Sequence, residues 1–161
     1  EGVMAIPDRI LAFLREKNAE YDHTRHPTTY TARELAHVDH VPERYVAKTV
    51  VFLGDEVFAM AVLPADENVD LDQLRRALGL ARLRLATEEE VAKLFPDCET
   101  GAMPPFGALF GLPVYVDNRL AEQDMLEFNA GTHRDELKMT YGEFARLAEP
   151  IVRHFGEPVS A

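Results

Sequence analysis

Lys48 is the residue whose type and surroundings most directly suggest anion binding. It lies in the apolar run from Val46 to Val51, which has the β-branched composition of a strand. Because side chains alternate along a strand, Lys48 shares a face with Val46 and Val50. Its ammonium group then either extends into solvent at a sheet edge, the commoner arrangement, or points into a cleft, where it could contact a phosphate.

A loop from Gly101 to Gly107 is the second candidate for chemistry, with the sequence Gly-Ala-Met-Pro-Pro-Phe-Gly. Its prolines stiffen the chain and remove two backbone donors, and its glycines permit a positive φ or a close backbone approach to a ligand. Such a loop can hold a small polar group without reorganising. A structural turn before a strand explains the same residues and is slightly favoured, because Gly/Pro loops are common.

Two pairs of histidines have a spacing that could bind a metal: His23 with His26, and His37 with His40. The first pair lies in a segment expected to be extended, which would point its rings to opposite faces. The second pair falls at a helix end, and no cysteine or acidic cluster completes either set. We therefore expect neither a metal nor another cofactor.

The sequence offers few nucleophiles for covalent catalysis. Cys98 is the only cysteine, which excludes an internal disulfide and favours the reducing cytoplasm. No partner that would activate its thiol is recognisable, so we expect it to be inert. Ser160 is the only serine, and its place near the C-terminus excludes a serine-nucleophile hydrolase. His133 follows Gly131 and fits either the wall of a site or a plain hairpin turn.

The net charge of −11 argues against duplex nucleic acid binding through a broad basic face. The acidic excess is uneven, since residues 1–50 carry 7 basic and 8 acidic groups. An anionic ligand would meet least repulsion at this part of the chain or at four clustered arginines, which are Arg75, Arg76, Arg82 and Arg84. The apolar runs are too short to cross a bilayer, and no export signal opens the chain. We expect no DNA partner, no membrane partner and a cytoplasmic location.

The elements that must position these residues alternate irregularly. A helix is predicted after Pro7, over residues 8–18. Four more are predicted from capping residues, over residues 31–38, 70–79, 87–95 and 140–148. Strands are predicted over residues 21–26, 46–53, 56–63, 82–85, 114–116, 125–128 and 137–139. Gly54 and Asp55 would form a hairpin turn between two of these strands, and residues 64–69 a loop.

This order and the length of 161 residues predict one α+β domain over residues 1–161, with helices packed on a mixed, largely antiparallel sheet. Its core would span about residues 8–149, followed by a tail over residues 150–161. Met4 is a candidate native start, which would make Glu1 to Val3 an added leader.

Together these segments resemble the YbaK/prolyl-tRNA-synthetase-associated editing domains over about residues 8–149. The resemblance rests on the Ala-Lys-Thr strand at 47–49 with its Gly-Asp turn, the helix from Asp70 to Leu80, and the G-x-x-x-P loop from Gly101 to Pro105. It implies a barrel-like mixed sheet. It also implies hydrolysis of the ester that links a wrong amino acid to tRNA, most often tRNA for proline.

The resemblance also implies roles for single residues. Lys48 would engage the phosphate at the 3′-terminal adenosine, and with Gly101 it forms the expected catalytic set. The loop that begins at Gly101 would bind the aminoacyl group through its backbone, and His133 would help to set the size of the accepted side chain. The expected substrate-binding residues are Thr49, Ala102, Met103, Pro104, Pro105, Phe106, Gly107, Gly131 and His133.

Such a reaction needs no protein nucleophile, because an aminoacyl ester is already activated. The enzyme positions a water and stabilises an oxyanion, for which one good N–H donor contributes about 3–4 kcal/mol. The ribose hydroxyl of the substrate can orient the water. We expect a deacylase for esters of Ala, Ser, Thr or Cys that contacts the tRNA 3′ end, with an aminoacyl-tRNA synthetase as a further partner. Two alternatives remain, a non-catalytic binding or regulatory module and a metal-dependent hydrolase that uses the N-terminal histidines.

Overall fold

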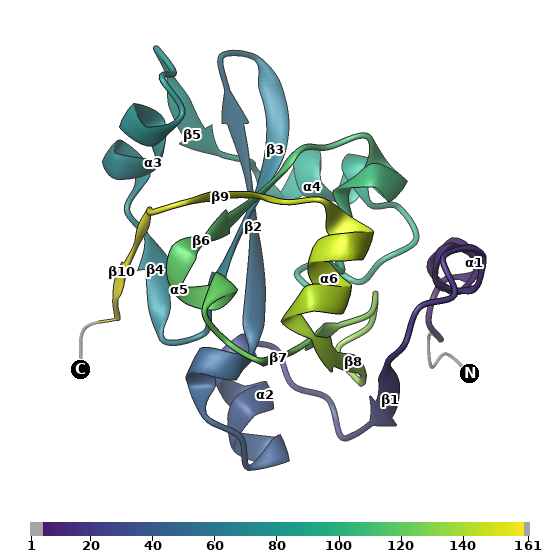
Figure 1. Cartoon of the computed structure of the whole chain (residues 1–161). Coiled ribbons are helices and arrows are strands. Elements are labelled where there is room, and N and C mark those ends of the chain that lie inside the picture. Colours follow the sequence, from purple (N-terminus) through teal and green to yellow (C-terminus); the bar gives the residue numbers. More distant parts are fainter. Residues whose placement is uncertain (1–4, 160–161) are drawn as a thin grey trace.

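A five-stranded sheet forms the centre of the computed structural model (Figure 1), which describes residues 5–159. In spatial order its strands are β5 (Leu83–Leu85), β2 (Ala47–Gly54), β3 (Val57–Pro64), β6 (Val114–Asp117) and β9 (Ile151–Arg153). β2 pairs antiparallel with β3 and β5, whereas β3 with β6 and β6 with β9 are parallel pairs. The predicted mixed sheet is therefore confirmed. The start proposed at Met4 lies outside the described residues.

The hairpin between β2 and β3 turns one residue later than predicted. Gly54 still pairs with Val57, and the turn residues are Asp55 and Glu56, with φ of 46° and 71°. Two positive φ angles are typical of a type I′ turn, whose twist matches the flanking strands. The Asp55 carboxylate accepts hydrogen bonds of 2.9–3.1 Å from the N–H groups at 81–82. This distant contact supports a conformation that the local sequence does not indicate.

A second, antiparallel sheet contains β1 (Asp22–Arg25), β8 (Asp135–Thr140) and β7 (Met125–Asn129), in that spatial order. A parallel bridge between Val46 and Glu127 joins the start of β2 to β7. The two sheets share one hydrophobic core, to which β3, β6, β7 and β8 all contribute. The arrangement is barrel-like only in that two sheets enclose one core, because the strands do not form one closed sheet.

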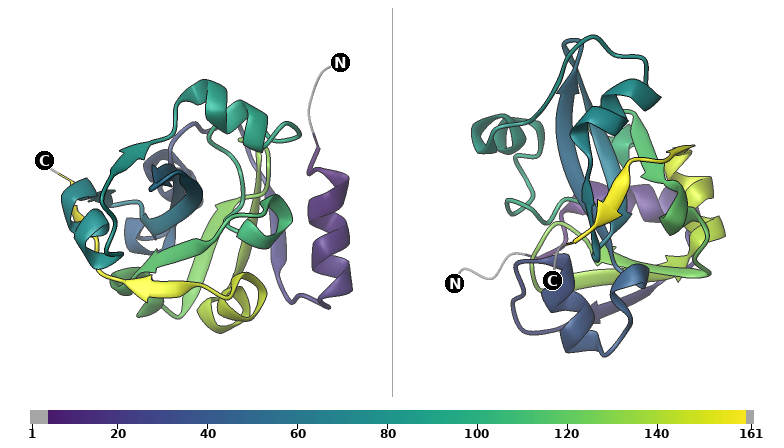
Figure 2. Two further views of the ribbon diagram at one scale, coloured as in Figure 1. Left: turned by 90° about the horizontal axis from the view of Figure 1, so that it is seen from above. Right: turned by 90° about the vertical axis from the view of Figure 1, so that its left-hand side faces the viewer.

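The helices lie around these sheets, with α1 and α3 on opposite sides of the molecule (Figures 1 and 2). Their bounds are Asp8–Glu16 (α1), Ala32–Asp39 (α2), Leu71–Ala77 (α3), Glu88–Leu94 (α4), Asn118–Ala121 (α5) and Tyr141–Ala148 (α6). Two 3₁₀ helices span Glu43–Tyr45 (η1) and Gly107–Phe110 (η2). Within residues 5–159, no helix combines the length and apolarity needed to span a membrane.

The prediction of a tail over residues 150–161 is wrong for residues 151–158. β9 pairs with β6, and β10 (Gly156–Pro158) pairs antiparallel with β4 (Glu67–Val69), which replaces part of the predicted 64–69 loop. Phe155 is fully buried, and Asp117 accepts hydrogen bonds of 2.8 Å from the N–H groups of Phe155 and Gly156. These strands of three residues depend on distant partners, so their local sequence carries little signal. Ser160 lies outside the described residues.

Phenylalanine rings anchor the Gly/Pro loop in the core. Phe106 is fully buried, with its ring centroid 5.2 Å from Phe13, 5.4 Å from Phe128 and 6.5 Å from Phe144. Truncating a buried phenylalanine of this kind costs about 3–5 kcal/mol. The packing of Phe106 against these rings therefore holds the loop backbone in place.

Candidate active site

A pocket of about 260 Å³ lies where the start of β2 meets the Gly/Pro loop. Four of the residues predicted from the sequence line it, namely Lys48, Thr49, Gly101 and Met103. The rest of the lining comes mainly from the start of α2 and the end of β7, and consists of Tyr30, Thr31, Ala32, Ala47, Phe128 and Asn129. The fold thus brings together a lysine and a glycine loop that are more than fifty residues apart in the sequence.

Lys48 lies at a sheet edge and also lines a pocket, so both arrangements considered for its side chain apply. β5 pairs only with the far end of β2, so Lys48 lies on a stretch of β2 that β5 does not cover, and its half-buried side chain lines the pocket. Its Nζ donates to Asn68 Oδ1 at 3.1 Å, and because this partner is a neutral amide the positive charge remains available to an anion. Burial lowers the pKa of the Lys48 ammonium group, and the charge of Arg33 lowers it further, against three nearby carboxylates (Asp66, Glu67 and Glu43).

Gly101 has a backbone conformation that favours glycine. Its φ is +85°, and a Cβ built there would lie 3.6 Å from His133 Cε1. Gly101 is exposed at the pocket, unlike the residues that follow it. Within residues 5–159, the N–H groups of Gly101 and Met103 have no hydrogen-bond acceptor. Both residues line the pocket, so two unbonded backbone N–H groups belong to its lining residues.

The remainder of the predicted loop is buried beneath the pocket rather than in its lining. These residues are Ala102, Pro104, Pro105, Phe106 and Gly107. At Gly107 a Cβ would lie 2.1 Å from the carbonyl oxygen of Leu112, so its glycine serves a close contact within the chain. Phe106 packs in the core, and only Gly101 and Met103 of this loop line the pocket.

Gly131 faces away from the pocket, contrary to expectation. A Cβ there would lie 2.6 Å from Pro7 Cδ, which places Gly131 against the start of α1. Its N–H donates to the Ala102 carbonyl at 2.7 Å, and its own carbonyl accepts from the Glu99 N–H at 2.8 Å. These two hydrogen bonds connect the segment after β7 to the Gly/Pro loop and to Glu99, which precedes the loop.

His133 is buried directly behind Gly101. Its Nε2 lies 2.7 Å from the Thr100 carbonyl oxygen, and its backbone N–H donates to the Glu99 carboxylate at 2.8 Å. Its ring centroid lies 5.2 Å from that of Tyr30, which lines the pocket mouth. His133 therefore supports two residues of the lining without itself belonging to it.

The arginine cluster is largely neutralised by neighbouring carboxylates. Arg75 and Arg76 pair with Asp72, and Arg84 makes two hydrogen bonds of 2.9 Å to Glu90. The cluster borders a second hollow of about 590 Å³ near the β2–β3 turn, where Arg82 and Arg84 are among the lining residues. We place the candidate site at the smaller pocket, because Lys48, whose Nζ bonds a neutral amide, and the residues with unbonded backbone N–H groups line it together.

The N-terminal histidines do not assemble into a metal site. His23 Nε2 lies 2.8 Å from a carboxylate oxygen of the buried Asp135, and His26 Nδ1 lies 2.6 Å from the Pro27 carbonyl oxygen. Among the described residues, the group of acidic or histidine side chains with suitable spacing contains no histidine. The alternative of a hydrolase that uses these histidines therefore has no structural support.

Comparison with known proteins identifies the family of the chain. Residues 26–147, which include the entire pocket lining, match the family model of the aminoacyl-tRNA editing domain. The chain belongs to this family. This editing domain is 28% identical over 152 residues to the multifunctional Ser/Thr-tRNA deacylase ProXp-y of Escherichia coli K12, covering 91% of this chain and 90% of the relative.

Two further relatives place the editing domain in context. It is 32% identical over 149 residues to the proline–tRNA ligase of Aquifex aeolicus, covering 83% of this chain but 24% of the ligase. A crystal structure described as a candidate trans-editing enzyme for prolyl-tRNA synthetase superposes with a TM-score of 0.83. That protein is 26% identical, and the match covers 97% of this chain and 99% of the other.

Proposed function

We propose that this chain is a trans-editing deacylase, which hydrolyses the ester bond of a tRNA mischarged with a small amino acid of the Ala, Ser, Thr or Cys class. The observation that carries the proposal is the meeting of Lys48 with the open backbone donors at Gly101 in one pocket. The similarity to a Ser/Thr-tRNA deacylase, which covers 91% of this chain and 90% of that relative, supports it. The similarity to proline–tRNA ligases supports tRNA for proline as the carrier.

In this proposal Lys48 binds the phosphate next to the 3′-terminal adenosine. An ammonium group pairs with phosphate as a compact positive charge. Thr31 caps α2 and Ala32 is its first residue, so the N-terminal end of this helix also borders the pocket. The partial positive charge of a helix N-terminus adds to the attraction for an anion.

The backbone donors at Gly101 and Met103 serve the reacting carbonyl. As water adds to the ester carbon, negative charge develops on the carbonyl oxygen, and each well-placed N–H group lowers the barrier by about 3–4 kcal/mol. The free ribose hydroxyl of the substrate orients the attacking water. The ester C–O bond then breaks, releasing the amino acid and the tRNA with a 3′-terminal diol.

The charge distribution fits contact with the end of the tRNA alone. A net charge of −11 opposes a broad RNA interface, whereas the near-neutral first 50 residues supply Lys48 and the start of α2. We propose that a basic partner, such as an aminoacyl-tRNA synthetase, holds the rest of the tRNA.

The proposal is tested with the purified chain and tRNA for proline that carries alanine. Release of alanine above the spontaneous rate is expected. The same assay is run with this tRNA carrying serine, threonine or cysteine, and if the chain binds these tRNAs without accelerating hydrolysis of any of them, the deacylase proposal fails and the non-catalytic module takes its place.

Replacing Cys98 with alanine should leave deacylation within about twofold of the wild-type rate, because no thiolate is available to attack the ester. Burial, and secondarily the charge of Asp97, raise the pKa of the Cys98 thiol to about 12. Initial rates and a search for a thioester by mass spectrometry check this. A loss of several orders of magnitude in a folded variant, or a trapped thioester, would restore a covalent mechanism.

Replacing Met103 with alanine should broaden the range of esters that are cleaved. Met103 is almost fully buried yet lines the pocket, so truncating it enlarges the space for the amino acid side chain. A rigid wall that excludes large side chains discriminates between substrates better than a difference in apolar binding energy does. One methylene contributes only about 1–3 kcal/mol to binding in an apolar pocket. The ratio of leucyl to alanyl ester hydrolysis should rise at least about tenfold. An unchanged ratio would show that Met103 does not limit side-chain size.

A further inference from the structure

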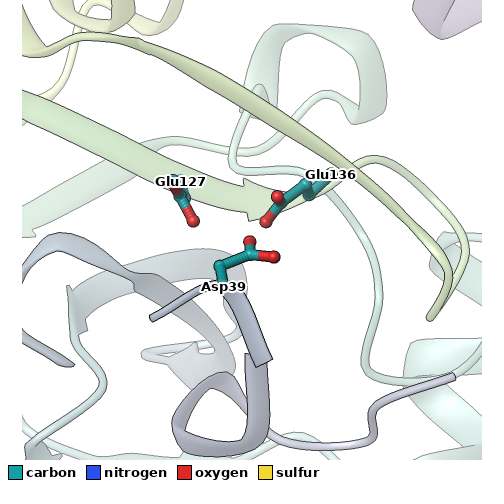
Figure 3. Close-up of side chains that lie close together, drawn as sticks. All are labelled: Asp39, Glu127 and Glu136. Atoms are coloured by element: carbon teal, nitrogen blue, oxygen red, sulfur yellow. The ribbon is translucent and has the colours of Figure 1, made fainter. Parts of the chain in front are cut away.

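Three carboxylates converge on the face of β7 and β8 that lies against α2 (Figure 3). Asp39 is the last residue of α2, Glu127 lies in β7 and Glu136 in β8. One carboxylate oxygen of each lies within 4.8 Å of the other two. Figure 3 shows the three carboxyl groups pointing toward one another. They lie outside the pocket lining and have no role in the proposed hydrolysis.

The two glutamates are buried and incompletely satisfied. Glu127 is 4% exposed and Glu136 is 3% exposed. One carboxylate oxygen of each, and one of Asp39, is buried without a hydrogen-bond partner. Buried polar atoms in proteins almost always have a partner, so these three oxygen atoms require either protons shared within the cluster or a bound cation.

The charges around the cluster also favour a cation. Lys138 lies opposite Glu127 in the β7–β8 ladder and supplies one positive charge against three carboxyl groups. α2 ends at Asp39, and the partial negative charge of a helix C-terminus favours a cation there.

We propose that Asp39, Glu127 and Glu136 bind one divalent cation of the hard class that prefers oxygen ligands, such as Ca²⁺, Mg²⁺ or Mn²⁺. Carboxylate oxygens are the preferred ligands of these ions. Oxygen ligands of such an ion lie about 2.0–2.6 Å from it, and the three carboxylate oxygens, which all lie within 4.8 Å of one another, are close enough to share one ion. Water would complete the coordination.

Such an ion would join the two walls of the pocket. α2 contributes Thr31 and Ala32 to the lining from its first turn, and β7 contributes Phe128 and Asn129 directly after Glu127. Fixing the last turn of α2 to β7 and β8 would hold these walls at a constant separation. The role of the ion is therefore structural, in stabilising the fold and the shape of the pocket.

Thermal unfolding of the full chain tests this site. The protein is first treated with a chelator, and the midpoint is then measured with and without millimolar Ca²⁺, Mg²⁺ or Mn²⁺. At a concentration about 100 times the dissociation constant, a bound ion should raise the wild-type midpoint by about 5 °C or more. Isothermal titration with the same ions should show one site per chain.

Glu136→Gln keeps the shape of the side chain but removes a ligand charge, so it should lose the cation-induced rise. Without cations this variant should be at least as stable as the wild type, because repulsion within the cluster is relieved. Glu89→Gln makes the same change at an exposed position of α4 and should keep the full rise. The proposal is overturned if no cation shifts the wild-type midpoint and titration shows no binding, or if Glu136→Gln shifts as much as the wild type.

Discussion

Replacing Lys48 with alanine should lower kcat/KM for deacylation by about 100-fold or more and leave the fold unchanged. Removing one partner of a buried charge pair costs about 2–5 kcal/mol, and each 1.4 kcal/mol corresponds to a factor of about ten. Lys48 is half-buried at the pocket, and its Nζ contacts only a neutral amide among the described residues, so truncation frees no buried carboxylate partner. Initial rates on alanyl-tRNA for proline, together with circular dichroism, measure both effects.

Lys93→Ala is the matched control for this experiment. Lys93 lies exposed on α4 and pairs only loosely with Glu89, at 3.6 Å, so its loss changes the net charge equally without touching the pocket. The control should retain the wild-type rate. Added salt should slow the wild type, because it screens the attraction between Lys48 and phosphate, and should slow Lys48→Ala much less. Wild-type rates for Lys48→Ala would remove Lys48 from the mechanism.

Replacing Gly101 with valine should lower the rate for every aminoacyl ester by at least about 100-fold, as expected for displacement of a backbone donor together with steric crowding at the pocket. A positive φ is unfavourable for any residue with a Cβ and most unfavourable for a β-branched one. Gly101 lines the pocket, and a Cβ there would lie 3.6 Å from His133 Cε1, so a larger side chain would crowd this part of the site. The proposed donors would shift and the ester would lose its approach.

Gly79→Val separates the two causes. Gly79 has a φ of +67°, and nothing lies within 4 Å of a Cβ built there. Both substitutions should therefore lower the unfolding midpoint through backbone strain, and only the substitution at Gly101 should abolish deacylation. Equal activity losses in the two variants would mean that general destabilisation, rather than the pocket, explains the effect.

Elements with local signals could be predicted from the sequence. The side chains of Thr31, Asp70, Thr87 and Thr140 each accept the N–H three residues on, so the four helix starts predicted from capping residues are confirmed. A capping hydrogen bond joins residues three apart, and the sequence displays such a pair directly. β4, β9 and β10 have three residues each and form only against distant partners, so the local sequence does not indicate strands at residues 67–69, 151–153 and 156–158.

Sequence motifs predicted some residues of the candidate site, whereas the other lining residues could be found only from the structure. Lys48, Thr49, Gly101 and Met103, all named from the sequence, line one pocket. Tyr30 and Asn129 reach the same pocket from elements that pattern alone cannot bring together. Asp39, Glu127 and Glu136 are likewise unrelated in sequence, so no acidic cluster was recognisable until α2 was placed against β7 and β8.

The most direct test of the proposed function is a comparison of deacylation rates across tRNA for proline charged with alanine, serine, threonine, cysteine or leucine. The wild-type chain should accelerate hydrolysis of at least one of the small aminoacyl esters well above the spontaneous rate. It should cleave the leucyl ester at least about tenfold more slowly than the preferred small ester, because the pocket excludes larger side chains. Equal rates for leucyl and small aminoacyl esters, or no acceleration for any of them, would contradict a size-selective editing deacylase.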